Sequence, residues 1–321
     1  MSKDFILVTG ASGFVGQSLC AKLLALNFKV RGVIRGLKIL PKGLDCIDIH
    51  GIDGSTIWSK ALTGCNQVIH LAARVHVIDD DISCALEKYR QVNVEGTLHL
   101  AIQAAAAGVK RFIYISSIKV NGESTLFDLP FHADDNPNPQ DPYGISKWEA
   151  EQGLKKISYQ TGMEVVIIRP PLVYGPGVKA NFLSMMNWLR RGIPLPFGGV
   201  TKNRRSFIFL GNLVDIIIAC INHPAAANQI FLVSDDEDLS TAGLLDRMAL
   251  ALGRPPKLIT IPTALITLGA KLIGRSGISQ RLCGSLQVDI KKTRDLLGWS
   301  PPVSVNEGLR QTAAYLLKME A

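Results

Sequence analysis

The residues best suited to proton transfer are a serine pair and a tyrosine followed four residues later by a lysine. Ser116 and Ser117 end an apolar run, and Tyr143 and Lys147 lie in the sequence Tyr-Gly-Ile-Ser-Lys. Residues four apart share one helix face, and Pro142 favours a helix start just before the tyrosine. The ammonium and the positive helix end should both lower the pKa of Tyr143 from its free value of ~10. The pattern predicts Tyr143 as a general acid–base, Lys147 as its charged neighbour and Ser117 as a hydrogen-bond donor to the reacting oxygen.

A glycine-rich loop near the N-terminus could bind a pyrophosphate. The first apolar run, Phe5–Thr9, leads into Gly10-Ala11-Ser12-Gly13-Phe14-Val15-Gly16 and then into a helical pattern. Glycines at these spacings allow a tight turn and close approach of the backbone to an anion at the helix N-terminus. The sequence therefore predicts a dinucleotide site. Its loop contacts are expected at Gly10, Ser12, Gly13, Phe14, Val15 and Gly16.

The end of the second apolar run bears on which dinucleotide binds. An acidic residue there would bind the ribose hydroxyl of NAD, whereas an arginine accommodates the 2′-phosphate of NADP. The residue is Arg35, and no Asp or Glu occurs between Asp4 and Asp45. NADP(H) is therefore favoured, and NAD(H) stays open. After the third run, Asp53 could accept from the adenine amino group, or it could simply form a turn with Gly54.

Short apolar runs alternate with helical patterns over the first half of the chain. The runs are two-sided in their hydrophobicity, as in a parallel sheet covered on both faces. This order predicts an α/β fold with a doubly wound parallel sheet. The predicted strands are Phe5–Thr9, Lys29–Arg35, Cys46–Ile52, Gln67–Ala72, Arg111–Ser116 and Glu164–Arg169, and the helical segments are Val15–Leu26, Ile82–Ala107 and Tyr143–Gln160.

The pattern changes after Arg169, where Pro and Gly become frequent and short strands mix with helices. We expect a dinucleotide-binding domain at 1–169 and a smaller mixed α/β substrate lobe at 170–321, partly interleaved with it. The short strands Ser206–Phe209 and Ile230–Val233 are assigned to this lobe. The net charge of +8 also falls in the second half of the chain, which suggests an anionic partner. A phosphorylated small molecule fits better than nucleic acid, since no basic arm or zinc finger is present.

Composition excludes several classes of protein. The chain has 321 residues, 47% hydrophobic and 19% charged, so it is an ordinary globular sequence. Its 6 cysteines form no Cys-x-x-Cys pair, and neither disulfides nor a metal site is expected. No secretory signal opens the sequence, which makes a cytoplasmic location the expectation. Leu258–Gly274 is too short for a transmembrane helix and is expected to be buried or surface-packed, with a membrane-surface role as the alternative.

Several motifs together resemble a known family. The chain is similar to the extended short-chain dehydrogenase/reductase superfamily and, within it, to the nucleotide-sugar epimerase/dehydratase branch that includes O-antigen sugar enzymes. The resemblance extends over essentially the whole length. The motifs are Thr9–Gly16, His70-Leu71-Ala72-Ala73, Ser116-Ser117, Tyr143–Lys147, Asn93-Val94-Glu95-Gly96-Thr97, Arg169-Pro170-Pro171-Leu172-Val173-Tyr174-Gly175-Pro176 and Leu297-Gly298-Trp299-Ser300-Pro301.

The resemblance implies a Rossmann domain with a bound nicotinamide cofactor and a UDP-sugar held by the C-terminal lobe. It leaves a homodimer open as the oligomeric state. Cofactor contacts are implied at Leu71, Ala72, Ala73, Asn93, Ser116, Pro170 and Val173, beside Tyr143 and Lys147. Substrate contacts are implied at Ser117, and at Asn181 and Arg205 for the diphosphate.

Departures from the family pattern narrow the reaction. Sugar dehydratases carry an acidic pair after the catalytic Ser/Thr, and here Ile118 and Lys119 stand there. Dehydratase activity is therefore not expected. Arg35 favours an NADPH-dependent reduction of the 4-keto group of a UDP-4-keto-6-deoxy-N-acetylhexosamine. The alternative is a UDP-hexose or UDP-N-acetylhexosamine 4-epimerase that retains NAD.

Overall fold

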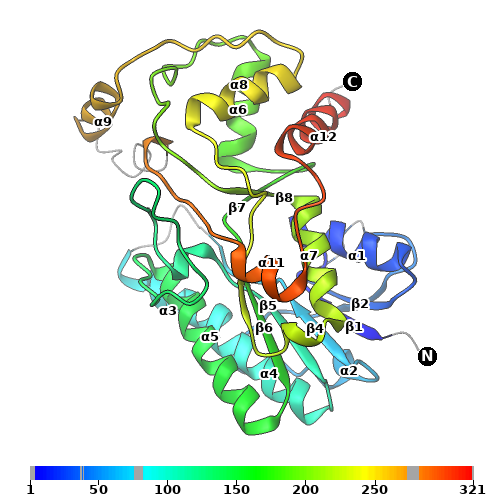
Figure 1. Ribbon diagram of the computed structural model, residues 1–321. Coiled ribbons are helices and arrows are strands. Elements are labelled where there is room, and N and C mark those ends of the chain that lie inside the picture. The colour runs from blue at the N-terminus through cyan, green and yellow to red at the C-terminus, as the bar shows by residue number, and fades with distance from the viewer. Residues whose placement is uncertain (1–3, 37, 39, 76–81, 273–281, 320–321) are drawn as a thin grey trace.

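The computed structural model describes residues 4–36, 38, 40–75, 82–272 and 282–319, and a seven-stranded parallel sheet forms its centre (Figure 1). The strand order β3-β2-β1-β4-β5-β6-β9 reverses direction beside β1, which defines a doubly wound sheet. The fold class predicted from the sequence is confirmed. The strands are β1 (Phe5–Thr9), β2 (Lys29–Ile34), β3 (Asp45–Asp48), β4 (Gln67–His70), β5 (Arg111–Ile115), β6 (Glu164–Arg169) and β9 (Ile230–Leu232).

Helices cover both faces of the sheet because alternate strand residues point to opposite sides. On one face, Ile6 and Val8 pack with α1 (Phe14–Ala25), α7 (Leu210–Asn222) and α11 (Lys291–Leu297). On the other face, Leu7 and Phe112 pack with residues of the remaining helices of this half. Those helices are α2 (Ser59–Leu62), α4 (Thr97–Ala106) and α5 (Pro142–Thr161), and α3 (Ile82–Arg90) and the π-helix η1 (Gln91–Gly96) lie between α2 and α4 in the sequence.

A second group of elements builds a separate apolar core at the carboxyl end of the sheet. Buried side chains of α6 (Ala180–Arg190), α8 (Thr241–Ala251) and α12 (Val305–Lys318) pack together there. A two-stranded parallel ladder, β7 (Leu172–Tyr174) with β8 (Phe207–Phe209), runs beside them. The other elements of this half are α9 (Thr263–Leu272) and the 3-10 helix η3 (Pro224–Ala226).

The strand near Ile230 is not part of the substrate lobe, where the sequence analysis assigns it. It forms β9, and Ile230 pairs with Ile167 at the edge of the main sheet. The chain thus returns to the first half after building β7, α6 and β8. The division at residue 169 stays a prediction. None of the helices in the described part of the chain has the length and apolar character to cross a membrane.

Candidate active site

The glycine loop joins β1 to α1 in a turn that only glycine can make. Gly10 has φ +68°, and a Cβ there would lie 2.9 Å from the backbone nitrogen of Ala72. A Cβ at Gly16 would lie 2.1 Å from the Gly10 carbonyl oxygen, so the helix start and the loop touch directly. No side chain caps α1 at Gly13, and its first turn has no acidic residue. The first N–H groups of the helix are therefore suited to an anion.

A cavity of about 450 Å³ opens beside this loop at the carboxyl ends of β1, β2 and β4. Predicted cofactor residues that line it are Gly10, Ser12, Gly13, Arg35, Leu71, Ala72 and Ala73. The apolar wall of the cavity was not predicted from the sequence; it consists of Val33, Ile34, Ile49, Ile52, Val75 and Val92, and Arg74 also lines the cavity. Val33 and Ile34 end β2, and Ile49 follows β3. These positions at strand ends could have predicted that the three residues line the cavity.

The two residues predicted to bind the adenosine part of the cofactor, Arg35 and Asp53, differ in their position relative to the cavity. Arg35 is exposed and lines the cavity. Asp53 is not among the lining residues, and its Oδ1 accepts hydrogen bonds from the backbone nitrogen (2.8 Å) and hydroxyl (2.7 Å) of Ser55. These bonds lower the pKa of Asp53. Asp53 thus stabilises a turn, which is the alternative role that the sequence left open for it.

Ser117 and Tyr143 are brought together by close packing of the turn after β5 against the start of α5. Ser117 caps the 3-10 helix η2 (Ile118–Val120), and its Oγ accepts from the Lys119 backbone nitrogen at 3.2 Å. A Cβ at Gly144 would lie 2.9 Å from the Lys119 carbonyl oxygen, so this contact requires glycine. Asp141 caps α5 by accepting from Gly144 N at 2.7 Å, with Pro142 at the first position. Tyr143 therefore lies in the first turn of the helix, as predicted.

Lys147 lies one turn further along the same face and is buried. Its Nζ donates to the Ile115 carbonyl oxygen at 2.8 Å and lies 4.5 Å from the Tyr114 ring centroid and 5.9 Å from that of Tyr143. Burial lowers the pKa of Lys147 to about 7, although Glu151 acts in the opposite direction.

The expected lowering of the Tyr143 pKa is wrong for the protein alone. Its pKa is raised, first by loss of hydration and then by the negative charge of Asp141. Lys147 cannot compensate, because its own charged form is destabilised by burial and its ammonium is turned to a backbone carbonyl. Sequence spacing placed the two residues correctly but could not show that Lys147 is buried and Tyr143 half-buried.

Ser116 and Asn93 hold the site together through buried side chains. The Ser116 hydroxyl donates to Glu151 Oε1 at 2.5 Å, and Glu151 also pairs with Arg169. Asn93 accepts from the Arg74 backbone nitrogen at 2.8 Å and donates to Ser146 Oγ at 3.0 Å. The polar side-chain atoms of both residues therefore bind protein groups, and each supports a segment that lines the site.

The remaining predicted residues lie around the site at different depths. Pro170 is buried, and its carbonyl accepts from the Ile118 backbone nitrogen at 3.0 Å, whereas Val173 packs on the core beside the sheet. Phe14 lines a separate hollow next to Tyr315 of α12. Val15 follows it in the first turn of α1.

The two proposed diphosphate contacts are in the C-terminal half. Asn181 is exposed in the first turn of α6. Arg205 is partly buried and donates from Nη1 to the Gly284 carbonyl oxygen at 3.2 Å. Neither lines the cavity beside the glycine loop, and their contact with a substrate stays a prediction.

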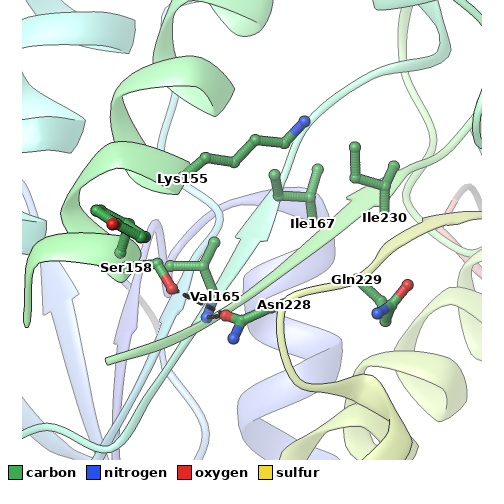
Figure 2. A pocket seen from close by; sticks show the side chains of 8 residues that line it. Lys155, Ser158, Val165, Ile167, Asn228, Gln229 and Ile230 are labelled. Atoms are coloured by element: carbon green, nitrogen blue, oxygen red, sulfur yellow. Dashed lines mark hydrogen bonds between the residues drawn. The ribbon is translucent and has the colours of Figure 1, made fainter. Parts of the chain in front are cut away.

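Another hollow of about 240 Å³ lies between α5 and the edge strand β9 (Figure 2). There the Asn228 amide oxygen accepts from the Ser158 hydroxyl (2.9 Å) and from the Val165 backbone nitrogen (3.0 Å). Val165 and Ile230 stand at the beginnings of their strands. Ligands of doubly wound sheets bind at the carboxyl ends, so this hollow is not the candidate active site.

The fold and the glycine cradle define a class of protein, the dinucleotide-binding α/β enzymes. A Cβ at Gly10, Gly13 or Gly16 would crowd the backbone of the loop or of Ala72, so glycine keeps this backbone compact, and Arg35 lines the cavity next to it. The residues present thus fit a nicotinamide dinucleotide. In the described part of the chain, no group of acidic, His or Cys residues could hold a metal ion.

Comparison with known proteins gives the family. Residues 6–234 match the model of the NAD dependent epimerase/dehydratase family, and the chain belongs to that family. It is 49% identical over 314 residues to a UDP-glucose 4-epimerase of Vibrio cholerae, covering 98% of this chain and 95% of the relative. The chain is also 28% identical to a relative from Escherichia coli O157:H7, over 97% of this chain and 95% of the relative. That relative is an N-acetyl-alpha-D-glucosaminyl-diphospho-ditrans,octacis-undecaprenol 4-epimerase.

The fold also matches a solved structure. The UDP-glucose 4-epimerase of Thermotoga maritima has a TM-score of 0.78 with 23% identity, covering 99% of this chain and 100% of the other. At this identity the match shows the fold.

These findings correct the predicted reaction. The expectation of an NADPH-dependent 4-ketoreductase is wrong, because the relative from Vibrio cholerae, similar over nearly the full length, is a 4-epimerase. The error came from Arg35, which bears on the choice of dinucleotide but not on whether hydride stays in the site. Ser117, Tyr143 and Lys147 are compatible with either reaction, so the residues predicted to be catalytic could not decide between them.

Proposed function

We propose that this protein is a 4-epimerase of a UDP-hexose or UDP-N-acetylhexosamine. The observation that carries the proposal is the 49% identity to a UDP-glucose 4-epimerase over nearly the whole of both chains. The relative from Escherichia coli O157:H7 is also named as a 4-epimerase, of a lipid-linked sugar. We favour the UDP-sugar because its relative is much the more similar of the two.

The residues of the site suit the proton transfers of such a reaction. When bound, an oxidised nicotinamide dinucleotide supplies an acceptor that takes a hydride from the sugar C4 and returns it to either face. We assign Tyr143 to take the proton of the C4 hydroxyl group as a phenolate, which makes it a phenol, and to give the proton back when hydride returns to C4. Ser117 would hold the reacting oxygen by a hydrogen bond. Lys147, whose pKa is about 7 and whose Nζ lies 5.9 Å from the Tyr143 ring centroid, would favour that phenolate when its amine is protonated.

Substrate binding is assigned to the C-terminal half. We propose that Asn181 and Arg205 bind the diphosphate, since a guanidinium forms charge-assisted hydrogen bonds to phosphate oxygens. Binding would require Arg205 to give up or share its bond to the Gly284 carbonyl. The net charge of +8 favours an anionic substrate.

For the dinucleotide, we propose a preference for NADP(H) over NAD(H). Arg35 is exposed at the end of β2 and lines the cavity, where it can approach a 2′-phosphate. The family is described as NAD dependent, which supports a nicotinamide dinucleotide but does not decide whether it carries the 2′-phosphate. Identification of the dinucleotide released by denaturing the purified protein tests this preference.

The reaction itself is tested by incubating purified protein with UDP-glucose, UDP-galactose and their N-acetyl counterparts. We expect each pair to interconvert, with no net change in reduced nicotinamide, as followed by NMR and absorbance. A Tyr143→Phe variant is the control for a contaminating activity. Absence of interconversion with all four sugars, in protein shown to contain the dinucleotide, would overturn the proposal.

A further inference from the structure

The helix α9 carries an exposed apolar stripe that the rest of the described chain leaves uncovered. In a helix, residues 265, 268 and 272 project from one face. Leu265, Leu268 and Leu272 are 58%, 54% and 79% exposed. Figure 1 shows α9 at the periphery of the molecule, apart from α6 and α8. The expectation that the segment Leu258–Gly274 would be buried or packed is met at Leu258, which packs on the core, but not at the three leucines of α9.

The opposite side of α9 is the side attached to the protein. The hydroxyl of Thr263 donates to the Gly199 carbonyl oxygen at 3.4 Å, and Ile266 is partly buried. The segment before the helix is held by backbone bonds, from Leu195 N to Lys257 O at 2.9 Å and from Ile259 N to Leu195 O at 2.8 Å. The leucine stripe thus faces outward because the helix is fixed by its other face.

The surroundings of this stripe are strongly basic. The sequence has no Asp or Glu from residue 165 to 214 or from 247 to 288, although both segments contain several Lys and Arg. These segments pair with each other through Leu195 and Leu258. Lys271 lies on α9 itself. Among the described residues, none forms an ion pair with the exposed side chains of Arg191, Arg254, Lys257 or Lys271.

We infer that α9 and its basic surroundings dock this protein on an anionic lipid surface. Leucines on one face with lysines beside them match the interface of a bilayer, where apolar groups enter the acyl boundary and ammonium groups meet phosphates. α9 has 10 residues, far short of the ~20 needed to span a bilayer, so it lies on the surface. A second copy of this chain is disfavoured because two such faces would bring like charges together. Nucleic acid offers no partner for the leucines.

Sedimentation with vesicles tests the inference on the full chain. We expect binding to phosphatidylcholine vesicles with about 30% phosphatidylglycerol, much weaker binding to phosphatidylcholine alone, and loss of binding at high salt. Leu268→Glu with Leu272→Glu should reduce the partition coefficient more than tenfold, since each leucine would lose its burial in lipid. Ile57→Glu is the matched control, because Ile57 is 79% exposed in the other half.

Charge is tested in the same way. Lys257→Glu with Lys271→Glu should weaken binding severalfold, whereas Lys155→Glu with Lys156→Glu on α5, the same change in net charge, should not. The inference is overturned if the wild type fails to bind the anionic vesicles or if the leucine variant binds them like the wild type. It is also overturned if light scattering shows a dimer of the wild type and a monomer of the leucine variant. Vesicle binding does not depend on epimerase activity, so either proposal can fail alone.

Discussion

At the scale of single residues, the hydroxyl of Tyr143 is the group that the proposed reaction cannot replace. Tyr143→Phe should lower kcat about 100-fold or more, as expected for loss of a positioned acid–base. The dissociation constant of the dinucleotide should change little, because the ring can keep its edge contact with Tyr89, 6.0 Å between centroids. Steady-state kinetics and a binding titration measure both quantities. Tyr159→Phe, at an exposed position, is the control. Near-normal turnover of Tyr143→Phe would assign proton transfer to another group.

The buried Lys147 makes stability depend on pH. Its pKa falls from 10.5 to about 7 on folding, so between these values the unfolded chain binds more protons than the folded one. The free energy of unfolding of the dinucleotide-free protein should therefore rise with pH across this range, as far as Lys147 is concerned. Lys147→Met removes the titrating group. The difference between variant and wild type, measured by urea unfolding at several pH values, isolates its contribution. A pH-independent difference would show that Lys147 has an ordinary pKa.

Arg35 decides the dinucleotide preference in our proposal. Arg35→Asp should weaken NADPH binding more than tenfold and leave NADH binding equal or tighter, because a charge-assisted phosphate contact becomes a repulsion. Titration of both dinucleotides at fixed salt measures the order. Lys29→Asp is a matched control, since Lys29 is exposed at the other end of the same strand. Tighter NADH than NADPH binding by the wild type would remove the argument from Arg35.

At the scale of elements, the N-terminus of α5 positions Tyr143, the tyrosine of the proposed reaction. Asp141 accepts from Gly144 N at 2.7 Å and also pairs with Lys119 of the neighbouring η2. Asp141→Ala should cost about 1 kcal/mol of stability as a lost cap and lower kcat by loosening Tyr143. Asp141→Asn keeps the cap and should retain more of the activity.

Ser304→Ala is the control for the Asp141 variants, because it also removes a helix cap but lies away from Tyr143. Ser304 caps α12, with its Oγ accepting from Glu307 N at 3.4 Å. This variant should lose stability without loss of kcat. Equal kcat values for Asp141→Ala and wild type would contradict a positioning role for the α5 cap.

The same elements show what sequence reasoning could reach. The bounds of β1 and β6 were predicted as observed, because period and flanking residues are local signals. The helical pattern at 82–107 was also right, but the π-helix η1 interrupts it. The place of β9 was missed because its pairing with β6 joins residues far apart in the chain. Likewise, the cavity wall formed by Val33, Ile52 and Val92 comes from separate elements, and no local pattern brings them together.

At the scale of the whole molecule, the two halves of the chain share one core. The cluster on one face of the sheet joins Ile6 and Ile113 of the first half to Leu213 and Ile217 of α7. Arg111 ties the halves by polar contacts, since its Nη1 donates to the carbonyl oxygens of Cys220 (2.7 Å), Ile221 (2.9 Å) and His223 (3.0 Å). One face of the sheet therefore depends on residues that come after position 169.

This dependence predicts that a fragment of residues 1–169 does not fold alone. Without α7 and β9, the fragment would expose Val166 and Ile168 of β6 to water and leave the buried Arg111 without its carbonyl partners. Exposure of these two side chains, at ~1.5–3 kcal/mol each, removes a large part of the stability of about 5–15 kcal/mol that a domain usually has. Circular dichroism should show the fragment without a cooperative melt and unable to bind dinucleotide.

The full chain provides the comparison for the fragment. It should unfold in urea in one transition, with the same midpoint by circular dichroism and by tryptophan fluorescence, because Trp58 and Trp299 are buried in opposite halves of the sequence. If the fragment melted cooperatively and bound dinucleotide, the first half would be an independent domain, and the contacts of α7 and Arg111 would be accessory to its folding.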